Sequence, residues 1–385
     1  MQFVEVIGQQ AVKKRFIQSV LEERVSHAQL IFGPEGSGGL PLALAFAQFL
    51  TCEKPTESDS CGACPSCIKN QKMVHPDVHY SFPIATVRDV TKPKSADFLE
   101  DFRQSVLEQP YLDLNDWLGN LDVANKQGFM SAEESADILR KLHLKSYESP
   151  FKIVIQWMPE KMNASAATKL LKIIEEPPDK TIFFLVTENR DQIIGTILSR
   201  TQLIKINQLT DDDVQQALIE RLQLQPAQAR SIAHLADGNY HLAMQLSAHE
   251  PAEKSFEEQF IEWMRLCFQP FKSFDKLLPW VDTISKSGRE RQKQFLIGSI
   301  QTLRECIIAN LAPTELLRLD DHQKQLLKDF MPFIHQQNMH EFIGELNEAC
   351  YHIERNANPK ILFLDLSFRL NKVLMTKRAD TVAAR

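Results

Sequence analysis

Four cysteines lie close together in the first quarter of the chain. Cys52, Cys61, Cys64 and Cys67 bring four thiol groups into one short stretch. A structural zinc ion takes four tetrahedral ligands, and closely spaced cysteines supply them, so we expect a zinc module over 52–67. An iron–sulfur cluster, which also uses C-x2-C-x2-C spacing, and four free thiols are the alternatives. A site with four protein ligands is structural, because it leaves no open position for catalysis.

A glycine-rich segment, GPEGSGGL at 33–40, follows an apolar run and opens a helical pattern. This is the setting of a phosphate-binding loop, whose pattern is G-x-x-x-x-G-K-[ST]. Gly33 and Gly38 fit, but Gly39 stands where a lysine would neutralise phosphate and Leu40 where a hydroxyl would bind magnesium. The backbone N–H groups could still attract an anion, and a plain strand-to-helix turn is the alternative. We expect that ATP does not bind here.

A second part of the ATP machinery is also altered. In hydrolytic P-loop proteins, a neighbouring strand ends in acidic residues that hold magnesium and orient water. In KIVIQWMPEKM (152–162), Trp157 and Met158 occupy those places, and Glu160 is near but out of register. The pattern indicates a nucleotide-binding fold that has lost its own catalysis.

The elements that position these residues alternate between strand-like and helix-like patterns. Short apolar runs predict buried strands, and amphipathic runs predict helices. The expected strands cover 28–33, 151–157 and 180–187, and the expected helices cover 10–25, 39–52 and 163–178. Strands separated by helices predict a parallel sheet with crossover helices. The fold class is therefore α/β, followed by an all-α region.

Three domains are expected from this organisation. Residues 1–206 form the nucleotide-binding-like domain, 207–250 a small helical lid and 251–385 a second helical domain. The stretch from about 85 to 128 is poorly periodic, so we interpret it as an insertion. The scattered cysteines of the helical domain are expected to be small buried hydrophobes.

The composition restricts the classes of function. A formal net charge of −6 argues against a protein that coats DNA through bulk charge. The N-terminus MQFVEVIGQQ shows neither a basic start nor a long apolar core, so we expect a cytoplasmic protein without a membrane segment.

Several segments in this order resemble the AAA+ clamp-loader family of bacterial DNA polymerase III, which includes the gamma/tau and delta-prime subunits. They are HAQLIFGPEGSG, the four-cysteine cluster, HPD (75–77), MNASAATKLLKIIEEPPDKTIFFLVT and TILSRT (196–201). The resemblance covers residues 1–245 well, and the rest more loosely through NPKILFLDLSFRL. It implies an AAA+ domain with a zinc module, a helical lid and a C-terminal collar, although the apolar faces of the last helices could equally form an internal core.

The resemblance assigns roles to single residues. Arg200, after Ser199 in TILSRT, matches the arginine finger that contacts the γ-phosphate of ATP bound to a neighbouring subunit. A surface arginine at the end of a helix is the alternative. Glu188 stands at the sensor threonine and His241 at the lid arginine of active members. His75 is an outside candidate for zinc but also begins the HPD segment.

The family also implies partners. A non-catalytic, delta-prime-type subunit would assemble with gamma/tau-type and delta-type subunits in a pentamer-like hetero-oligomer, and would reach the sliding clamp and primer–template DNA through that complex. Lys161, Lys169 and Lys172 would face the DNA, or would form an ordinary solvated helix face. One alternative is an active gamma/tau-like ATPase. Another is a zinc-stabilised DNA-binding module.

Overall fold

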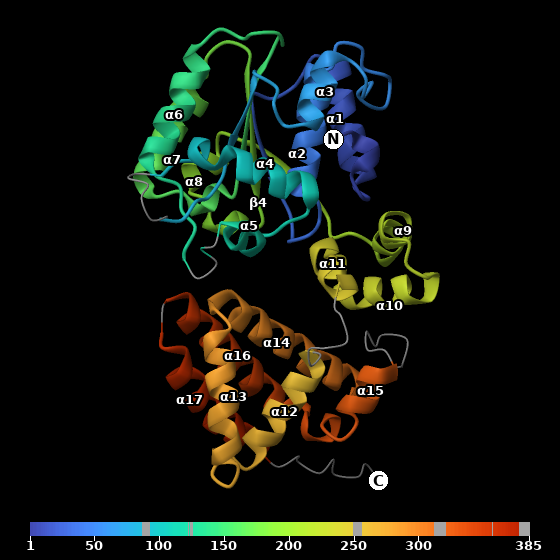
Figure 1. The fold of residues 1–385 in the computed structure, drawn as a ribbon, viewed down its shortest axis with the longest axis vertical. Coiled ribbons are helices and arrows are strands. Elements are labelled where there is room, and N and C mark those ends of the chain that lie inside the picture. The colour runs from blue at the N-terminus through green and yellow to red at the C-terminus, as the bar shows by residue number, and fades with distance from the viewer. Residues whose placement is uncertain are drawn as a thin grey trace, which may run out of the picture. The chain divides into compact units, whose positions relative to one another are not determined.

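The structure is a computed structural model of the 385-residue chain, and it describes residues 1–86, 93–121, 123, 126–248, 256–311, 321–355 and 357–376. The chain divides into two compact units, Met1–Ala248 and His249–Arg385 (Figure 1). The expected boundary between sheet domain and lid at residue 206 falls inside the first unit and stays a prediction. The expected boundary at 250 lies outside the described residues.

A five-stranded, wholly parallel sheet forms the centre of the first unit, with strand order β2-β3-β4-β1-β5. The strands are β1 (Ala28–Phe32), β2 (Val78–Ser81), β3 (Lys152–Trp157), β4 (Thr181–Thr187) and β5 (Gln202–Lys205). The three predicted strands are confirmed as β1, β3 and β4. The two edge strands were not predicted, because four residues are too few for a clear periodicity.

Side chains of β4 alternate between the two faces of the sheet, as a pleated strand requires. Phe184 and Val186 pack into one apolar cluster with helix α2, while Phe183 and Leu185 pack into another with helix α7. Both faces of the sheet are therefore covered, and Figure 1 shows α1–α3 and α6–α7 on opposite sides of it. The helices of this α/β part are α1 (Gln10–Leu21), α2 (Gly39–Thr51), α3 (Pro65–Gln71), α4 (Leu99–Glu108), α5 (Leu114–Asn120), α6 (Ala132–His143), α7 (Ala164–Glu175) and α8 (Gly195–Leu198).

The stretch at 85–128 contributes to the core. Phe82 stacks on Phe102 of α4 with ring centroids 3.8 Å apart, and Trp117 of α5 meets both rings edge-on. The indole Nε1 of Trp117 donates a hydrogen bond to the Pro83 carbonyl oxygen at 2.7 Å. Residues 87–92, 122, 124 and 125 of this stretch lie outside the described residues.

Three helices complete the first unit, namely α9 (Asp211–Leu222), α10 (Pro226–Ala236) and α11 (Tyr240–Ala248). Thr210 caps α9 by accepting the N–H of Asp213, and the Asp213 carboxylate accepts the N–H of Thr210 in return. Their core cluster also contains Tyr111, which comes from the loop between α4 and α5. A side chain from the expected insertion thus belongs to the core of the expected lid.

The second unit is helical. Its helices are α12 (Phe256–Phe268), α13 (Phe274–Lys286), α14 (Arg289–Leu311), α15 (Asp321–Leu327), α16 (Gln336–Glu354) and α17 (Pro359–Leu374). One apolar cluster joins them, centred on Trp263, which stacks on Trp280 and donates to Ser367 Oγ at 2.9 Å. The apolar faces expected on these helices therefore form an internal core. Among the described helices, none is long and apolar enough to cross a membrane.

Candidate functional site

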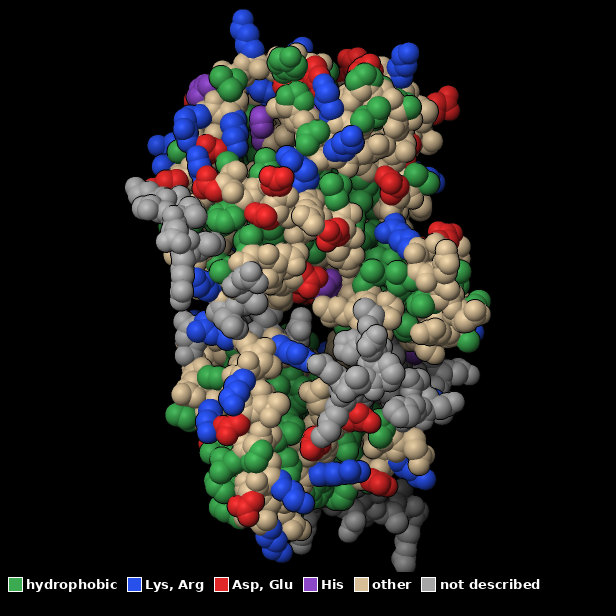
Figure 2. All heavy atoms as spheres, in the orientation of Figure 1, with side chains coloured by type: hydrophobic (Ala, Val, Ile, Leu, Met, Phe, Trp, Pro, Cys, Tyr) green, Lys and Arg blue, Asp and Glu red, His purple; other side chains and the backbone are tan. Residues whose placement is uncertain are grey.

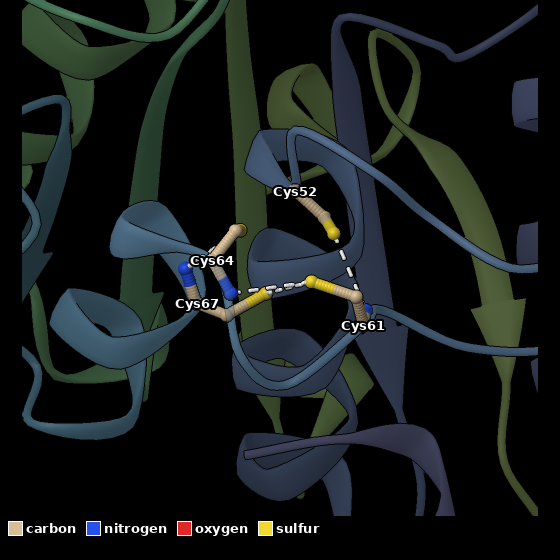
Figure 3. Close-up of side chains that lie close together, drawn as sticks. All are labelled: Cys52, Cys61, Cys64 and Cys67. Carbon is tan, nitrogen blue, oxygen red and sulfur yellow. Dashed lines mark hydrogen bonds between the residues drawn. The ribbon is translucent and has the colours of Figure 1, made fainter.

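The four cysteines converge where α2 ends and α3 begins. Their sulfur atoms all lie within 4.8 Å of one another, and the Sγ atoms of Cys61 and Cys67 are 3.9 Å apart. Four sulfurs at about 2.3 Å from a tetrahedral zinc ion would lie just under 4 Å from one another, so this spacing fits zinc. In Figure 3 the side chains of Cys52 and Cys67 both approach Cys61. The cluster ties the end of α2 to the start of α3.

Backbone N–H groups surround these sulfur atoms. The N–H groups of Cys61, Cys64 and Cys67 point at the sulfurs of Cys52, Cys61 and Cys64, respectively, at 3.3–3.4 Å. Backbone N–H groups of Ala63 and Cys64 lower the pKa of Cys61 to about 6, whereas burial raises the pKa of Cys67. Because thiolates are the ligands that zinc takes, the hydrogen-bonded loop is suited to hold them.

His75 lies apart from this group. Its Nε2 is 3.2 Å from the Glu148 carboxylate, and its Nδ1 accepts the N–H of Asp77. The Asp77 carboxylate in turn accepts the backbone N–H groups of Tyr147 and Glu148. The HPD segment is therefore a structural turn that anchors the loop before β3.

The glycine-rich loop joins β1 to α2, at the opposite end of α2 from the cysteines. Gly38 has φ +95°, a conformation open to glycine, and a Cβ on Gly33 would lie 2.3 Å from the Ile206 side chain. A Cβ on Gly39 would lie 3.0 Å from Val186 Cγ1. The loop links a strand to a helix, as a phosphate-binding loop does. A side chain at position 39, however, would come into close contact with Val186.

The space above this loop is small. The cavity lined by the loop, by Pro110–Leu112 and by Trp157 measures about 30 Å³. A single water molecule needs roughly 10–15 Å³ measured in this way, so the cavity has room for about two waters. Tyr111 is one of the lining residues, and its ring would meet a Cβ on Gly38 at 3.1 Å. The sequence contained no signal for this side chain, because it comes from the poorly periodic stretch.

Carboxylates surround the same loop. Burial by the surrounding protein is the largest cause that raises the pKa of Glu188, which reaches about 8. The nearby carboxylates of Glu35, Glu160 and Asp113 add to this rise. Part of the Glu188 side chain is nevertheless exposed. Burial also raises the pKa of Glu160, whose Oε2 has no hydrogen-bond partner among the described residues. Glu188 is therefore largely protonated near neutral pH, and these acidic groups do not supply the positive field of a phosphate-binding loop.

His241 lies at the start of α11, and only 2% of its side chain is exposed. Its Nε2 is 3.8 Å from Asp113 Oδ2, and its Nδ1 is 3.4 Å from Asp116 Oδ2. The residue expected at the lid arginine position thus faces carboxylates of this same chain.

Arg200 follows α8 directly, in the short link to β5. Its Nε lies 2.5 Å from Glu175 Oε1, and its Nη1 donates to the Thr196 carbonyl and to Ser199 Oγ, both at 3.1 Å. The Arg200 side chain is 40% exposed. The guanidinium therefore lies at the surface in a defined orientation, held by a carboxylate that sequence reasoning did not identify.

The lysines considered for DNA contact lie on or just before α7. Lys169 and Lys172 are exposed on α7, and Lys169 Nζ donates to the Ala132 carbonyl oxygen at 3.2 Å. On the face in Figure 2, basic and acidic side chains are interspersed, with basic groups gathered over α6. Arg140 and Lys141, which belong to α6, both pair with Asp137 at 2.8 Å.

Residues 8–210 match the protein family described as "DNA polymerase III, delta subunit". Because the match spans more than half of the chain, the chain belongs to this family. The predicted fold class, a parallel α/β sheet followed by helices, is confirmed.

Curated relatives support the same family. The DNA polymerase III subunit delta' of Bacillus subtilis (strain 168) is 26% identical over 247 residues, which cover 64% of this chain and 61% of that protein. The DNA polymerase III subunit tau of the same organism is 25% identical over 249 residues, which cover 63% of this chain and 37% of that protein. This chain thus spans less than two thirds of either relative.

A solved DNA polymerase III gamma subunit-related protein of Thermotoga maritima aligns with 95% of this chain and 100% of its own, at a TM-score of 0.41 and 14% identity. A likeness at this level carries no argument about function.

Proposed function

We propose that this chain is a non-catalytic, delta-prime-type subunit of a DNA polymerase III clamp loader. It would support ATP-dependent loading of the sliding clamp onto primed DNA without hydrolysing ATP itself. The observation that carries this proposal is the state of the glycine-rich loop. Its lysine and hydroxyl are replaced by Gly39 and Leu40, and the cavity above it measures about 30 Å³. A loop without that charge and space lacks the means to bind Mg-ATP.

In this proposal, Arg200 acts on ATP bound by the neighbouring gamma/tau-type subunit. A guanidinium stabilises the charge that builds on the transferred phosphoryl group, and its planar fork suits phosphate oxygens. The exposed position of Arg200, and its fixed orientation against Glu175 and Ser199, support this role. Ser199 orients the arginine through its hydroxyl oxygen.

The zinc site would be structural. Cys52, Cys61, Cys64 and Cys67 would hold the ion, which would supply cross-linking between α2 and α3 and no chemistry. The delta-type subunit, the sliding clamp and primer–template DNA would be partners through the assembled complex, in which the helical second unit would serve as the collar.

The test of the finger is Arg200→Ala in a reconstituted complex with gamma/tau-type and delta-type subunits. DNA-stimulated turnover at the neighbouring site is expected to fall by roughly 10³-fold, because one phosphate-contacting guanidinium is lost. Arg200→Lys should not restore it, since an ammonium lacks the planar fork. Assembly, measured by size-exclusion chromatography, is expected to stay intact.

Two controls accompany this test. Arg24→Ala removes another exposed arginine and should leave turnover unchanged, as should Gly39→Ala, which alters a loop without a catalytic role. Wild-type turnover by Arg200→Ala in an assembled complex would refute the finger assignment.

An active gamma/tau-like ATPase is the second candidate, because the tau relative is almost as similar to this chain as the delta' relative. The two candidates differ in nucleotide binding by the isolated chain. Titration calorimetry with Mg-ATP should show no binding under the first proposal, and micromolar binding under the second.

A further inference from the structure

The loop between α4 and α5 reaches into the place of a nucleotide. Tyr111 is 4% exposed, and its ring lies against Gly38 of the glycine-rich loop. Its Oη accepts the backbone N–H of Ile7 at 2.8 Å, so the side chain is fixed at its far end as well. Burial raises the pKa of Tyr111, which therefore stays neutral. A neutral aromatic ring thus covers the loop that binds phosphate in ATP-binding proteins.

The same tyrosine contacts the helices α9–α11. Its ring meets that of Tyr240 edge-on, with centroids 4.9 Å apart. The guanidinium of Arg221, from α9, lies 5.9 Å from the Tyr111 ring and 5.6 Å from the Tyr240 ring. Tyr111 also belongs to the apolar core of these helices, together with Leu209. The Tyr111 side chain therefore connects the glycine-rich loop to the apolar core of α9–α11.

Asp113, two residues after Tyr111, makes a second contact with these helices. Asp113 caps α5 by accepting the N–H groups of Asn115 and Asp116, and it is 3% exposed. Its Oδ2 lies 3.8 Å from Nε2 of His241, the residue that the family resemblance places at the lid arginine of active members. The aspartate therefore links α5 to the start of α11.

The cluster of Asp113, His241 and Glu35 is a contact between segments rather than a metal site. Ligand-type atoms of Glu35, Asp113 and His241 do lie within 4.8 Å of one another. However, both oxygens of Asp113 already accept hydrogen bonds from its own helix, including one from the Asn115 side chain at 2.7 Å. A carboxylate satisfied in this way is a positioned charge with little remaining capacity as a ligand.

The glycine-rich loop also contacts α11 directly. The backbone N–H of Tyr240 donates to the Gly36 carbonyl at 3.2 Å, and Asn239 Nδ2 donates to Glu35 at 3.2 Å. A Cβ on Gly36 would lie 1.9 Å from Asn239 Oδ1, so this approach requires glycine. The loop and the start of α11 are therefore in direct contact.

We propose that residues 110–116 are a built-in ligand of this nucleotide-binding fold. They take the place between the glycine-rich loop and α9–α11 that a nucleotide takes in an ATP-binding relative. They thereby hold α9–α11 in one position whether or not ATP is present. This inference rests on the proposed function in one respect, namely that the chain itself binds no ATP. Ligands that bind only one arrangement of a protein stabilise that arrangement, and a covalently attached one does so permanently.

The test is amide hydrogen exchange of the full-length chain, followed by mass spectrometry. Tyr111→Ala removes the ring that joins the loop to α9–α11. Exchange in α10 and α11 is expected to accelerate by about tenfold or more, while exchange in β3 and β4 stays unchanged. Tyr147→Ala is the matched control, because that tyrosine is 82% exposed. It should leave exchange in α9–α11 at the wild-type rate.

A second variant covers the case in which Tyr111→Ala does not fold. Tyr111→Phe removes only the hydroxyl that accepts the Ile7 N–H, and it should accelerate exchange in α9–α11 by a smaller factor. Millimolar Mg-ATP should leave the wild-type exchange pattern unchanged. The proposal is overturned if α9–α11 exchange at the wild-type rate in the Tyr111 variants, if the sheet loses protection to the same degree, or if Mg-ATP protects α9–α11. Because these measurements use the isolated chain, they can fail independently of the Arg200 test.

Discussion

Single side chains decide which charges this fold presents to a phosphate. The loop that normally offers a lysine has Gly39, and carboxylates from three separate segments gather around it, namely those of Glu35, Glu160 and Glu188. The one guanidinium with a proposed role in catalysis, that of Arg200, lies at the surface beyond α8 and pairs with Glu175. This chain's own loop thus lacks its lysine, whereas in the proposed function Arg200 would offer a cation to a nucleotide elsewhere.

Glu188 makes the stability of the chain depend on pH. Its pKa is about 8 in the folded chain, against an ordinary value of 4.5, so the folded chain binds more protons between these values. Stability must therefore fall as pH rises from about 5 to 8. Replacing Glu188 with Gln removes this loss, and the variant should gain about 1 kcal/mol over wild type between pH 5.5 and 8, after allowing for partial exposure. Urea unfolding at both pH values measures the difference.

Glu176→Gln is the control for this measurement, because Glu176 is an exposed glutamate at the end of α7. It should show no pH-dependent gain. If the two glutamine variants behaved alike, the carboxylate of Glu188 would not be the group responsible.

At the scale of elements, α2 connects the two candidate sites. Its N-terminus carries the glycine-rich loop and its C-terminus leads into Cys52. Nearly every residue of α2 is buried, so it is the central helix on its face of the sheet. A zinc ion at its C-terminal end would fix α3 and the intervening loop to an element that cannot move without the core.

Loss of the zinc ligands should therefore affect stability and leave the fold of the sheet intact. We expect one zinc per chain in the wild type, and Cys64→Ser should abolish it. The loss of a structural metal should cost a few kcal/mol, which lowers the melting temperature by about 10 °C in a unit of this size. Elemental analysis and thermal unfolding of the same sample measure both effects.

Cys350→Ser is the control, since Cys350 lies on α16 in the second unit and far along the chain from the cluster. It should retain the full zinc content. Iron in place of zinc, or no metal in the wild type, would contradict the assignment.

At the scale of the whole molecule, the chain has two separate kinds of core. Within the described residues, each apolar cluster draws its buried members from one unit. The first unit surrounds a sheet, and the second is built from helices around Trp263 and Trp280. Each unit therefore has the means to be stable through its own packing.

This separation predicts two unfolding transitions that respond to different substitutions. Trp263→Ala leaves a large cavity in the second unit and should destabilise it by roughly 3–5 kcal/mol. Phe184→Ala should do the same to the first unit, because Phe184 is fully buried on the sheet. Denaturant unfolding followed by tryptophan fluorescence and by hydrogen exchange separates the two. A shift of both transitions by either substitution would show that the units unfold together.

Much of the fold could be predicted because local patterns carry it. Apolar runs predicted β1, β3 and β4, and the amphipathic run at 163–178 predicted α7, whose N-cap residue Asn163 accepts the Ala166 N–H at 2.8 Å. The edge strands β2 and β5 were missed, because short strands leave little periodicity. The helices α4 and α5 were missed because both are short and each buries only two or three side chains.

The sequence by itself determined the parts of this protein that depend on residue identity. These are the absent lysine at Gly39, the four thiols at 52–67 and the guanidinium of Arg200. Only the tertiary structure decided what occupies the space beside them, since Tyr111, Asp113 and Glu175 reach their partners across dozens of residues. Such contacts depend on how the chain returns to itself, and no local pattern encodes them because each arises from packing between distant segments.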